Sequence, residues 1–309
     1  MAQRAPAGPL IHIGLHRTGT TWLQRNVFAC AEAGFSTPWG RLSRAAVEHF
    51  VTVDPLHFDA EQSRRYFQPQ LDEAAQRRTV PVLTHEALSS RPHQGQYYAP
   101  QVARRLREVF PQGRVLIVVR EQKALLSSLY RQYVRNGGTY TIEQFLGGGD
   151  EAIGWAPLCR LPFFEFDRLV AFYQELFGRE GVLALPMELL KKDQEDFLAR
   201  IATFAGVIGR LTVDAAPANV GWSGATLAVY RRLNRFLARN PLEPRQPRSQ
   251  RYATRLFNKL DAWLPSSAHE RAEQRLEAFV AERVGNRFAD SNAKLASLLE
   301  MDLASLGYR

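Results

Sequence analysis

The sequence predicts an α/β fold, with a mainly parallel sheet and helices on both of its faces. Four short apolar runs, each suited to a buried strand, alternate with helical patterns along the first two thirds of the chain; these runs are 10–13, 80–84, 114–119 and 181–185. Such alternation is typical of a parallel sheet. Because the chain has 309 residues, 45% of them hydrophobic, it can bury a large core, and we expect residues 1–309 to form a single domain.

The segment after the first predicted strand carries the clearest functional signal. Gly14, four further residues and Gly19 precede Thr20 and Thr21, which open an amphipathic stretch. A strand that enters a helix through such a loop presents backbone N–H groups and the positive end of the helix dipole, and Gly19 lets the backbone approach an anion closely. We therefore expect a phosphorylated ligand at this phosphate loop.

The phosphate loop differs from that of nucleoside triphosphate hydrolases. Those proteins place a Lys directly after the last glycine, followed by a hydroxyl residue that binds Mg²⁺. Here Thr20 stands in the place of the Lys, and the nearest cation is Arg17, inside the loop. The sequence thus predicts an anion shorter than a triphosphate and a site with no obligatory metal.

A second motif stands at the end of the predicted strand 114–119. The strand ends in Arg120, where a nucleotide hydrolase commonly has an Asp for Mg²⁺. Apolar residues at three- to four-residue spacing predict a helix over 122–134, and Ser128 lies in its first turns. A guanidinium suits a phosphate dianion, and a nearby hydroxyl adds another donor. This strand-to-helix junction is therefore a second candidate phosphate site.

Both motifs resemble those of sulfotransferases that use 3′-phosphoadenosine 5′-phosphosulfate (PAPS), in particular bacterial members. The family's 5′-phosphosulfate loop reads like Lys-Ser-Gly-Thr-Thr-Trp, and residues 17–22 of this chain, Arg-Thr-Gly-Thr-Thr-Trp, match it with two conservative changes. The family's 3′-phosphate site has an Arg at a strand end and a Ser eight residues later. Arg120 and Ser128 have this spacing, which favours Ser128 over Ser127. The resemblance covers most of the chain and implies a P-loop nucleotide-binding fold. The donor-binding residues that it implies are Arg17, Thr18, Gly19, Thr20, Thr21, Trp22, Arg120 and Ser128.

The resemblance also implies an activity. A PAPS-dependent sulfotransferase moves a sulfuryl group to a hydroxyl, less often an amine, of a carbohydrate, glycolipid or small-molecule acceptor, without a metal. Arg17 stands where the family usually has Lys, and it is expected to hold the negative charge that develops on the leaving phosphate. Because its high pKa makes it a poor proton donor, His16 or a threonine hydroxyl would have to supply a proton there.

Two adjacent residues are candidates for the catalytic base. The predicted strand 80–84 ends in His85 and Glu86, at the same edge of the sheet as the phosphate motifs. Some members of the family use a His at this point and others a Glu. An imidazole is well matched to deprotonating an alcohol near neutral pH, which slightly favours His85, whereas Glu86 would need a raised pKa or a hydrogen-bonded pairing with the acceptor. Because the side chains of adjacent strand-end residues diverge, we expect only one of the two to face the donor sulfur.

The C-terminal third is predicted to be helical, at 225–238, 268–284 and 291–299. Between the first two helices, a segment near 239–252 is rich in Pro and Arg and poor in apolar residues, which indicates a loop or lid. It could fold over the donor or face an anionic acceptor, or it could be a solvated surface segment.

Composition limits the remaining function classes. The net charge of +9 suggests acidic ligands, but the charge is spread along the chain and no nucleic-acid-binding module is recognisable. Cys30 and Cys159 are too few for a disulfide framework or a zinc site. Since no run resembles a signal peptide or a transmembrane helix, we expect a cytoplasmic protein.

Two other functions are alternatives to a sulfotransferase. One is a nucleotide kinase or NTPase of similar fold, which Mg²⁺-dependent ATP hydrolysis would distinguish from a sulfotransferase, and the other is a non-catalytic polyanion-binding protein. The sequence does not predict the oligomeric state.

Overall fold

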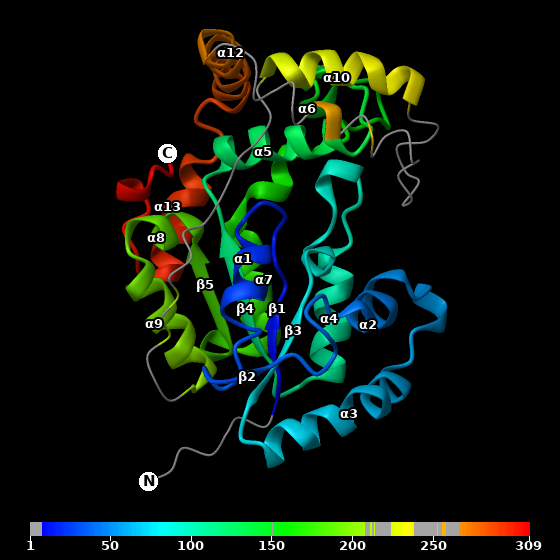
Figure 1. Ribbon diagram of the computed structural model, residues 1–309, viewed down its shortest axis with the longest axis vertical. Coiled ribbons are helices and arrows are strands. Elements are labelled where there is room, and N and C mark those ends of the chain that lie inside the picture. Colours follow the sequence, from blue (N-terminus) through cyan, green and yellow to red (C-terminus); the bar gives the residue numbers. More distant parts are fainter. Residues whose placement is uncertain are drawn as a thin grey trace.

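A parallel sheet forms the centre of the molecule. The computed structural model describes residues 8–149, 151–207, 211, 213, 224–237, 252, 255–257 and 266–309. Within these residues the sheet has five strands in the order β2-β3-β1-β4-β5, all parallel (Figure 1). The strands are β1 (Leu10–His12), β2 (Phe35–Ser36), β3 (Val80–Thr84), β4 (Arg114–Val119) and β5 (Val182–Pro186). The predicted α/β class is confirmed.

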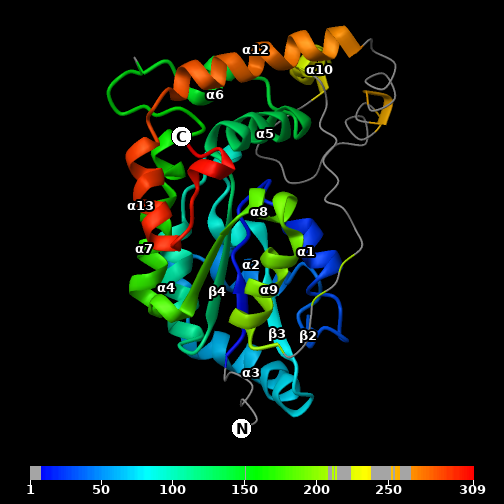
Figure 2. The ribbon, with the colours of Figure 1, turned by 90° about the vertical axis from the view of Figure 1, so that its left-hand side faces the viewer.

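Side chains alternate along the strands and build an apolar layer on each face of the sheet. On β4, Val115, Ile117 and Val119 belong to one buried cluster, and Leu116 and Val118 belong to the other. Figure 2 shows the helices of the two layers on opposite sides of β4. The first layer contains α4 (Ala99–Val109) and α7 (Phe166–Phe177), and the second contains α1 (Thr20–Asn26), α8 (Met187–Lys192) and α9 (Gln194–Ala205).

Helix α5 (Gln122–Arg135) lies across the carboxyl ends of the strands (Figure 1). It begins directly after β4 because the carboxylate of Glu121 accepts hydrogen bonds from the N–H groups of Lys123 and Ala124, at 2.9 and 2.7 Å. The outer side of α5 is covered by α10 and α12 (Figures 1 and 2). The other helices are α2 (Arg44–Val47), α3 (Ala60–Gln76), α6 (Ile142–Leu146), α10 (Gly224–Leu237), α12 (Ser266–Val284) and α13 (Ala289–Leu299).

Polar contacts fasten the C-terminal helices to α5. The Asn234 amide of α10 donates to the carbonyls of Val134 and Gly138, at 2.8 and 2.9 Å, where α5 ends. Arg131 of α5 forms an ion pair with Glu273 of α12. Asn234 thus binds carbonyl groups at and just beyond the end of α5, and the ion pair adds a contact between α5 and α12.

Most element boundaries agree with the sequence prediction. Strands 80–84 and 114–119 are as predicted, while β1 ends one residue earlier, at His12, and β5 is shifted by one residue. Helix α7 starts at Phe166, because Leu161–Phe164 form a 3-10 turn and Glu165, with ψ of 81°, leaves the helical region. The basic segment 239–252 lies outside the described residues, except for Tyr252. Its role as a lid stays a prediction.

Candidate functional site

The phosphate loop between β1 and α1 is tightly curled. Three of its residues have positive φ, namely Gly14 at 48°, Arg17 at 66° and Gly19 at 81°. A Cβ on Gly14 would lie 2.9 Å from Oγ1 of Thr20, so a side chain does not fit there. The Thr18 hydroxyl donates to the Leu15 carbonyl at 2.6 Å, and the Thr20 hydroxyl donates to the same oxygen at 3.3 Å. The loop is therefore held by its own hydroxyl groups.

Arg17 joins the two phosphate motifs. Its Nε donates to Oγ of Ser128 at 2.7 Å, and Nη1 of Arg120 donates to the Arg17 carbonyl at 3.1 Å. Ser128 is 111 positions from Arg17 in the sequence, and Arg120 is 103 positions from it. Ser128, the residue that the sequence favoured over Ser127, is the one that faces the loop.

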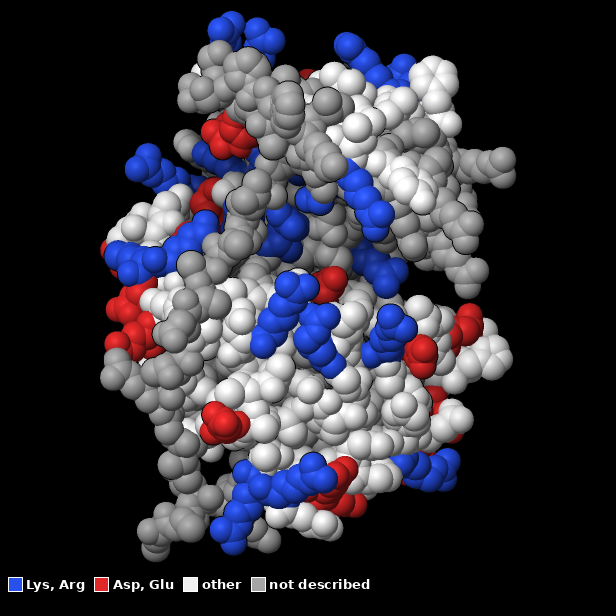
Figure 3. All heavy atoms as spheres, viewed as in Figure 1, with Lys and Arg blue, Asp and Glu red and all other residues white. Residues whose placement is uncertain are grey.

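The same place carries a concentration of positive charge. Burial, followed by the guanidinium groups of Arg120, Arg135 and Arg131, lowers the pKa of Arg17. Burial also lowers the pKa of Arg120, against the opposite effect of the Glu188 carboxylate. Figure 3 shows Lys and Arg side chains gathered across the middle of one face, below the C-terminal helices. Guanidinium groups that repel one another in a partly buried position favour binding of an anion.

Glu188 and Tyr308 complete the surroundings of Arg120 and were not predicted as site residues. Glu188, at the start of α8, accepts hydrogen bonds from the Glu121 N–H at 3.2 Å and from the Tyr308 hydroxyl at 2.9 Å. Burial, and then the Glu188 carboxylate, raises the pKa of Tyr308, so its hydroxyl remains a donor. Glu188 follows β5 as Arg120 follows β4, and that strand-end position could have identified it.

The remaining predicted donor residues lie in the first turn of α1. Thr21 is exposed, and Gly19 is the N-cap residue, with no side chain capping the helix. The Trp22 side chain is 9% exposed and packs in the second apolar cluster, with Leu23 and Phe28. Since the N–H groups of a first helical turn have no partner inside the helix, the backbone of this turn is the part that can contact an anion.

His85 and Glu86 lie beside the phosphate loop. Nδ1 of His85 accepts a hydrogen bond from the Ala87 N–H at 2.9 Å, so the neutral imidazole carries its proton on Nε2. Burial lowers the pKa of His85, which keeps the ring neutral. The Cα of Glu86 lies 3.4 Å from the position that a Cβ would occupy if Gly14 were replaced by alanine. The His85 N–H also donates to the carbonyl of His12, the last residue of β1, at 3.4 Å, so the backbone of both candidate bases is next to the loop.

Two further histidines of the site region are neutral. His16 and His93 are buried, with ring centroids 4.5 Å apart in an edge-to-face contact. Burial lowers the pKa of His16 well below its usual value, and it lowers that of His93 to about 4. His16 thus has no imidazolium proton to give near neutral pH, which argues against it as the proton donor to a leaving phosphate. His12 is a core residue, with Nδ1 2.9 Å from Oγ1 of Thr84.

In the part of the chain that the structure describes, no group of three or more His, Cys, Asp or Glu side chains is placed to hold a metal ion. Cys30 and Cys159 are free thiols. No helix within the described ranges is both long and apolar enough to cross a membrane.

Comparison with solved structures shows what this fold is similar to. The structure is similar to the crystal structure of a sulfotransferase from Alicyclobacillus acidocaldarius, with a TM-score of 0.56 over 97% of this chain and 98% of that chain. The two chains share one fold. Their sequences are only 17% identical, so the similarity shows the fold alone. No protein-family model matches the sequence, and no curated protein matches it.

Proposed function

We propose that this protein is an enzyme that transfers a sulfuryl group from PAPS to a hydroxyl group of a carbohydrate, a glycolipid or another small molecule. The observation that carries the proposal is the contact between the two phosphate motifs, in which Arg17 bonds Ser128 and Arg120 bonds the backbone of Arg17. A donor with charged groups at both its 5′ and 3′ positions requires two adjacent cationic sites, and these residues supply them. The fold shared with a solved sulfotransferase supports the proposal.

In this proposal the phosphate loop holds the 5′-phosphosulfate, and Arg120 with Ser128 holds the 3′-phosphate. A guanidinium has five N–H donors, and only Nε of Arg17 is engaged with Ser128. Arg17 can therefore keep that bond while its other N–H groups bind an oxygen of the donor. The shared bond fixes the distance between the two charged ends of the nucleotide before the donor arrives.

The transfer itself requires charge stabilisation and removal of one proton. The acceptor oxygen forms a bond to sulfur while the bond between sulfur and the bridging phosphate oxygen breaks, and adenosine 3′,5′-bisphosphate leaves with the electron pair. Arg17 and the loop N–H groups hold the charge that develops on the leaving phosphate, as in phosphoryl transfer. The acceptor proton goes to a base at the end of β3.

The hydrogen bond of His85 shifts the choice of base to Glu86. The lone pair on Nδ1 accepts the hydrogen bond from the Ala87 N–H and Nε2 carries the proton, so the neutral imidazole of His85 has no free lone pair to receive a second proton. Its Nε2–H can instead donate to an acceptor or sulfuryl oxygen. The Glu86 carboxylate accepts protons without any change of tautomer, so we assign the base to Glu86 and an orienting role to His85.

Ligand-dependent thermal unfolding tests the donor assignment. Adenosine 3′,5′-bisphosphate at a hundredfold excess over its Kd should stabilise the protein by about 2.7 kcal/mol, whereas ATP with Mg²⁺ should have a much smaller effect. Arg120→Gln should abolish the stabilisation by the bisphosphate. Arg114→Gln is the matched control, because Arg114 lies at the opposite end of β4 and donates to the carbonyls of Phe204 and Ala205.

Transfer of radioactive sulfate from labelled PAPS to a panel of hydroxylated sugars and glycolipids tests the reaction. Incorporation that depends on both Arg17 and Arg120 is the expected result. Stabilisation by ATP with Mg²⁺ alone would identify a nucleotide kinase or hydrolase instead. Binding of long polyanions that is indifferent to the bisphosphate would identify a non-catalytic polyanion-binding protein.

A further inference from the structure

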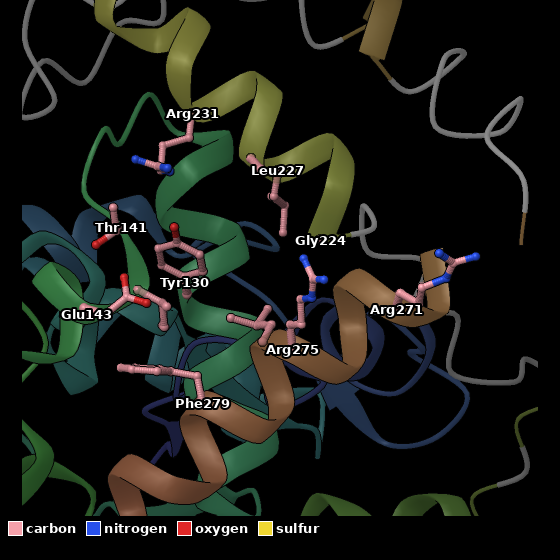
Figure 4. Close-up of a pocket in the computed structure, with 12 residues that line it drawn as sticks. Tyr130, Thr141, Glu143, Gly224, Leu227, Arg231, Arg271, Arg275 and Phe279 are labelled. Carbon is pink, nitrogen blue, oxygen red and sulfur yellow. The ribbon is translucent and has the colours of Figure 1, made fainter. Parts of the chain in front are cut away.

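A cavity of about 620 Å³ lies on the outer side of α5, between that helix, α6, α10 and α12 (Figure 4). Its size is within the range of small-molecule sites, roughly 300–1,000 Å³. Tyr130 of α5 lines it, whereas Ser128, two residues earlier, contacts the phosphate loop. Two residues correspond to a rotation of about 200° around a helix, so the cavity and the phosphate loop lie on opposite sides of α5.

The cavity is lined by more positive than negative charge. Arg231, Arg271 and Arg275 contribute guanidinium groups, and Glu143 contributes the one carboxylate among the lining residues. None of the three arginines forms an ion pair with a carboxylate of the described residues; Arg231 donates to the Thr139 carbonyl at 3.3 Å. In Figure 4 the Arg275 side chain extends from α12 toward the Gly224 end of α10, the Arg231 side chain extends from α10 toward Thr141, and Arg271 points away from Tyr130. Arg231 and Arg275 are therefore available to an anion.

The rest of the wall is apolar. Leu227 of α10, Leu276 and Phe279 of α12 and Ile142 of α6 line the cavity. An inorganic anion would leave this surface unused, and an uncharged apolar molecule would leave the guanidinium groups without a partner. The lining fits an organic anion that combines one acidic group with an apolar or aromatic body.

We propose that this cavity binds an organic anion, with its carboxylate, sulfate or phosphate group at Arg275 and its apolar body against Leu227, Leu276 and Phe279. The site is independent of the proposed donor site, because none of the residues assigned to PAPS lines the cavity. Binding there does not require that the protein be a sulfotransferase.

Titration calorimetry with 2-naphthoate tests the proposal, with 2-naphthamide as the uncharged analogue and acetate as the anion without an apolar body. Naphthoate should bind at least about tenfold more tightly than either, because a hydrogen bond to a charged group contributes about 1.5–3 kcal/mol. Arg275→Gln should weaken naphthoate binding by about tenfold or more, and it removes no hydrogen bond to any residue that the structure describes. Arg231→Gln should weaken naphthoate binding less than Arg275→Gln does, because the Arg231 side chain is turned toward Thr141 and donates to the Thr139 carbonyl.

Arg232→Gln is the matched control, since Arg232 is exposed on the same helix and does not line the cavity. It should leave naphthoate binding unchanged, and saturating adenosine 3′,5′-bisphosphate should not displace naphthoate. Any of four results would overturn the proposal: naphthoate does not bind, it binds no more tightly than naphthamide, its affinity is unchanged by Arg275→Gln, or the bisphosphate displaces it. Failure of bisphosphate binding alone would count against the donor assignment and leave this site standing.

Discussion

Buried neutral histidines should make the folded protein sensitive to mild acid. Burial lowers the pKa of His12 from 6.5 to about 3 and, together with the charge of Arg91, lowers that of His93 to about 4. Below pH 6.5 the unfolded chain therefore binds protons at these positions and the folded protein does not. Folding stability is thus fully present above pH 6.5 and falls as the pH decreases, until it approaches the lowered pKa values.

The expected loss can be calculated. At pH 5, about 1.5 units below the ordinary pKa, each of these two histidines destabilises the folded state by about 2 kcal/mol, or about 4 kcal/mol together. That is a large part of the roughly 5–15 kcal/mol that stabilises a typical domain. His16, which is also buried and neutral, adds to the effect in the same direction.

Urea unfolding at pH 7 and pH 5 measures this difference. His93→Gln should reduce the loss between the two pH values by about 2 kcal/mol, whatever it does to stability at pH 7. His57→Gln, at a histidine whose side chain is 82% exposed, is the control and should leave the loss unchanged. Equal pH dependence in the parent protein and the His93→Gln variant would refute the reasoning.

Three further predictions follow from single contacts. Gly14→Ala should cost about 1–3 kcal/mol more than Gly40→Ala in urea unfolding, since both glycines have positive φ but only Gly14 faces an atom within 4 Å; equal costs would contradict this. Glu86→Gln should lower kcat by about 10²–10⁴ while bisphosphate binding persists, and an unchanged kcat would remove Glu86 as the base. A double-mutant cycle of Arg131→Gln and Glu273→Gln should give a coupling of about 1 kcal/mol that decreases in high salt; additive effects would mean that this pair does not stabilise the packing of α12 against α5.

The sheet was largely predictable because its central strands are buried on both faces. Residues 80–84 and 114–119 form continuous apolar runs, and the structure places β3 and β4 there. Strand β2, Phe35–Ser36, was not predicted, since two residues carry no recognisable periodicity. The order β2-β3-β1-β4-β5 is set by the packing of the helices that connect the strands, which local patterns do not encode.

The candidate site was predictable where a residue stands at the end of a strand. Arg120, His85 and the phosphate loop could be placed together from the sequence, because parallel strands end at one edge of the sheet. Tyr308 and the arginine-lined cavity could not, since they depend on how C-terminal helices pack against elements far away in the chain. The tautomer of His85 also depends on a local hydrogen bond that no sequence pattern specifies.

The clustering of Arg17 with Arg120 and Arg131 has a practical consequence for anyone who handles the protein. Like charges held at close range in a partly buried site attract whatever small anion the buffer contains. Phosphate and sulfate buffers should therefore compete with nucleotides, and apparent affinities measured in them should be weaker than those in chloride at the same ionic strength. Preparations in such buffers should also unfold at a higher temperature, because an occupied site relieves the repulsion.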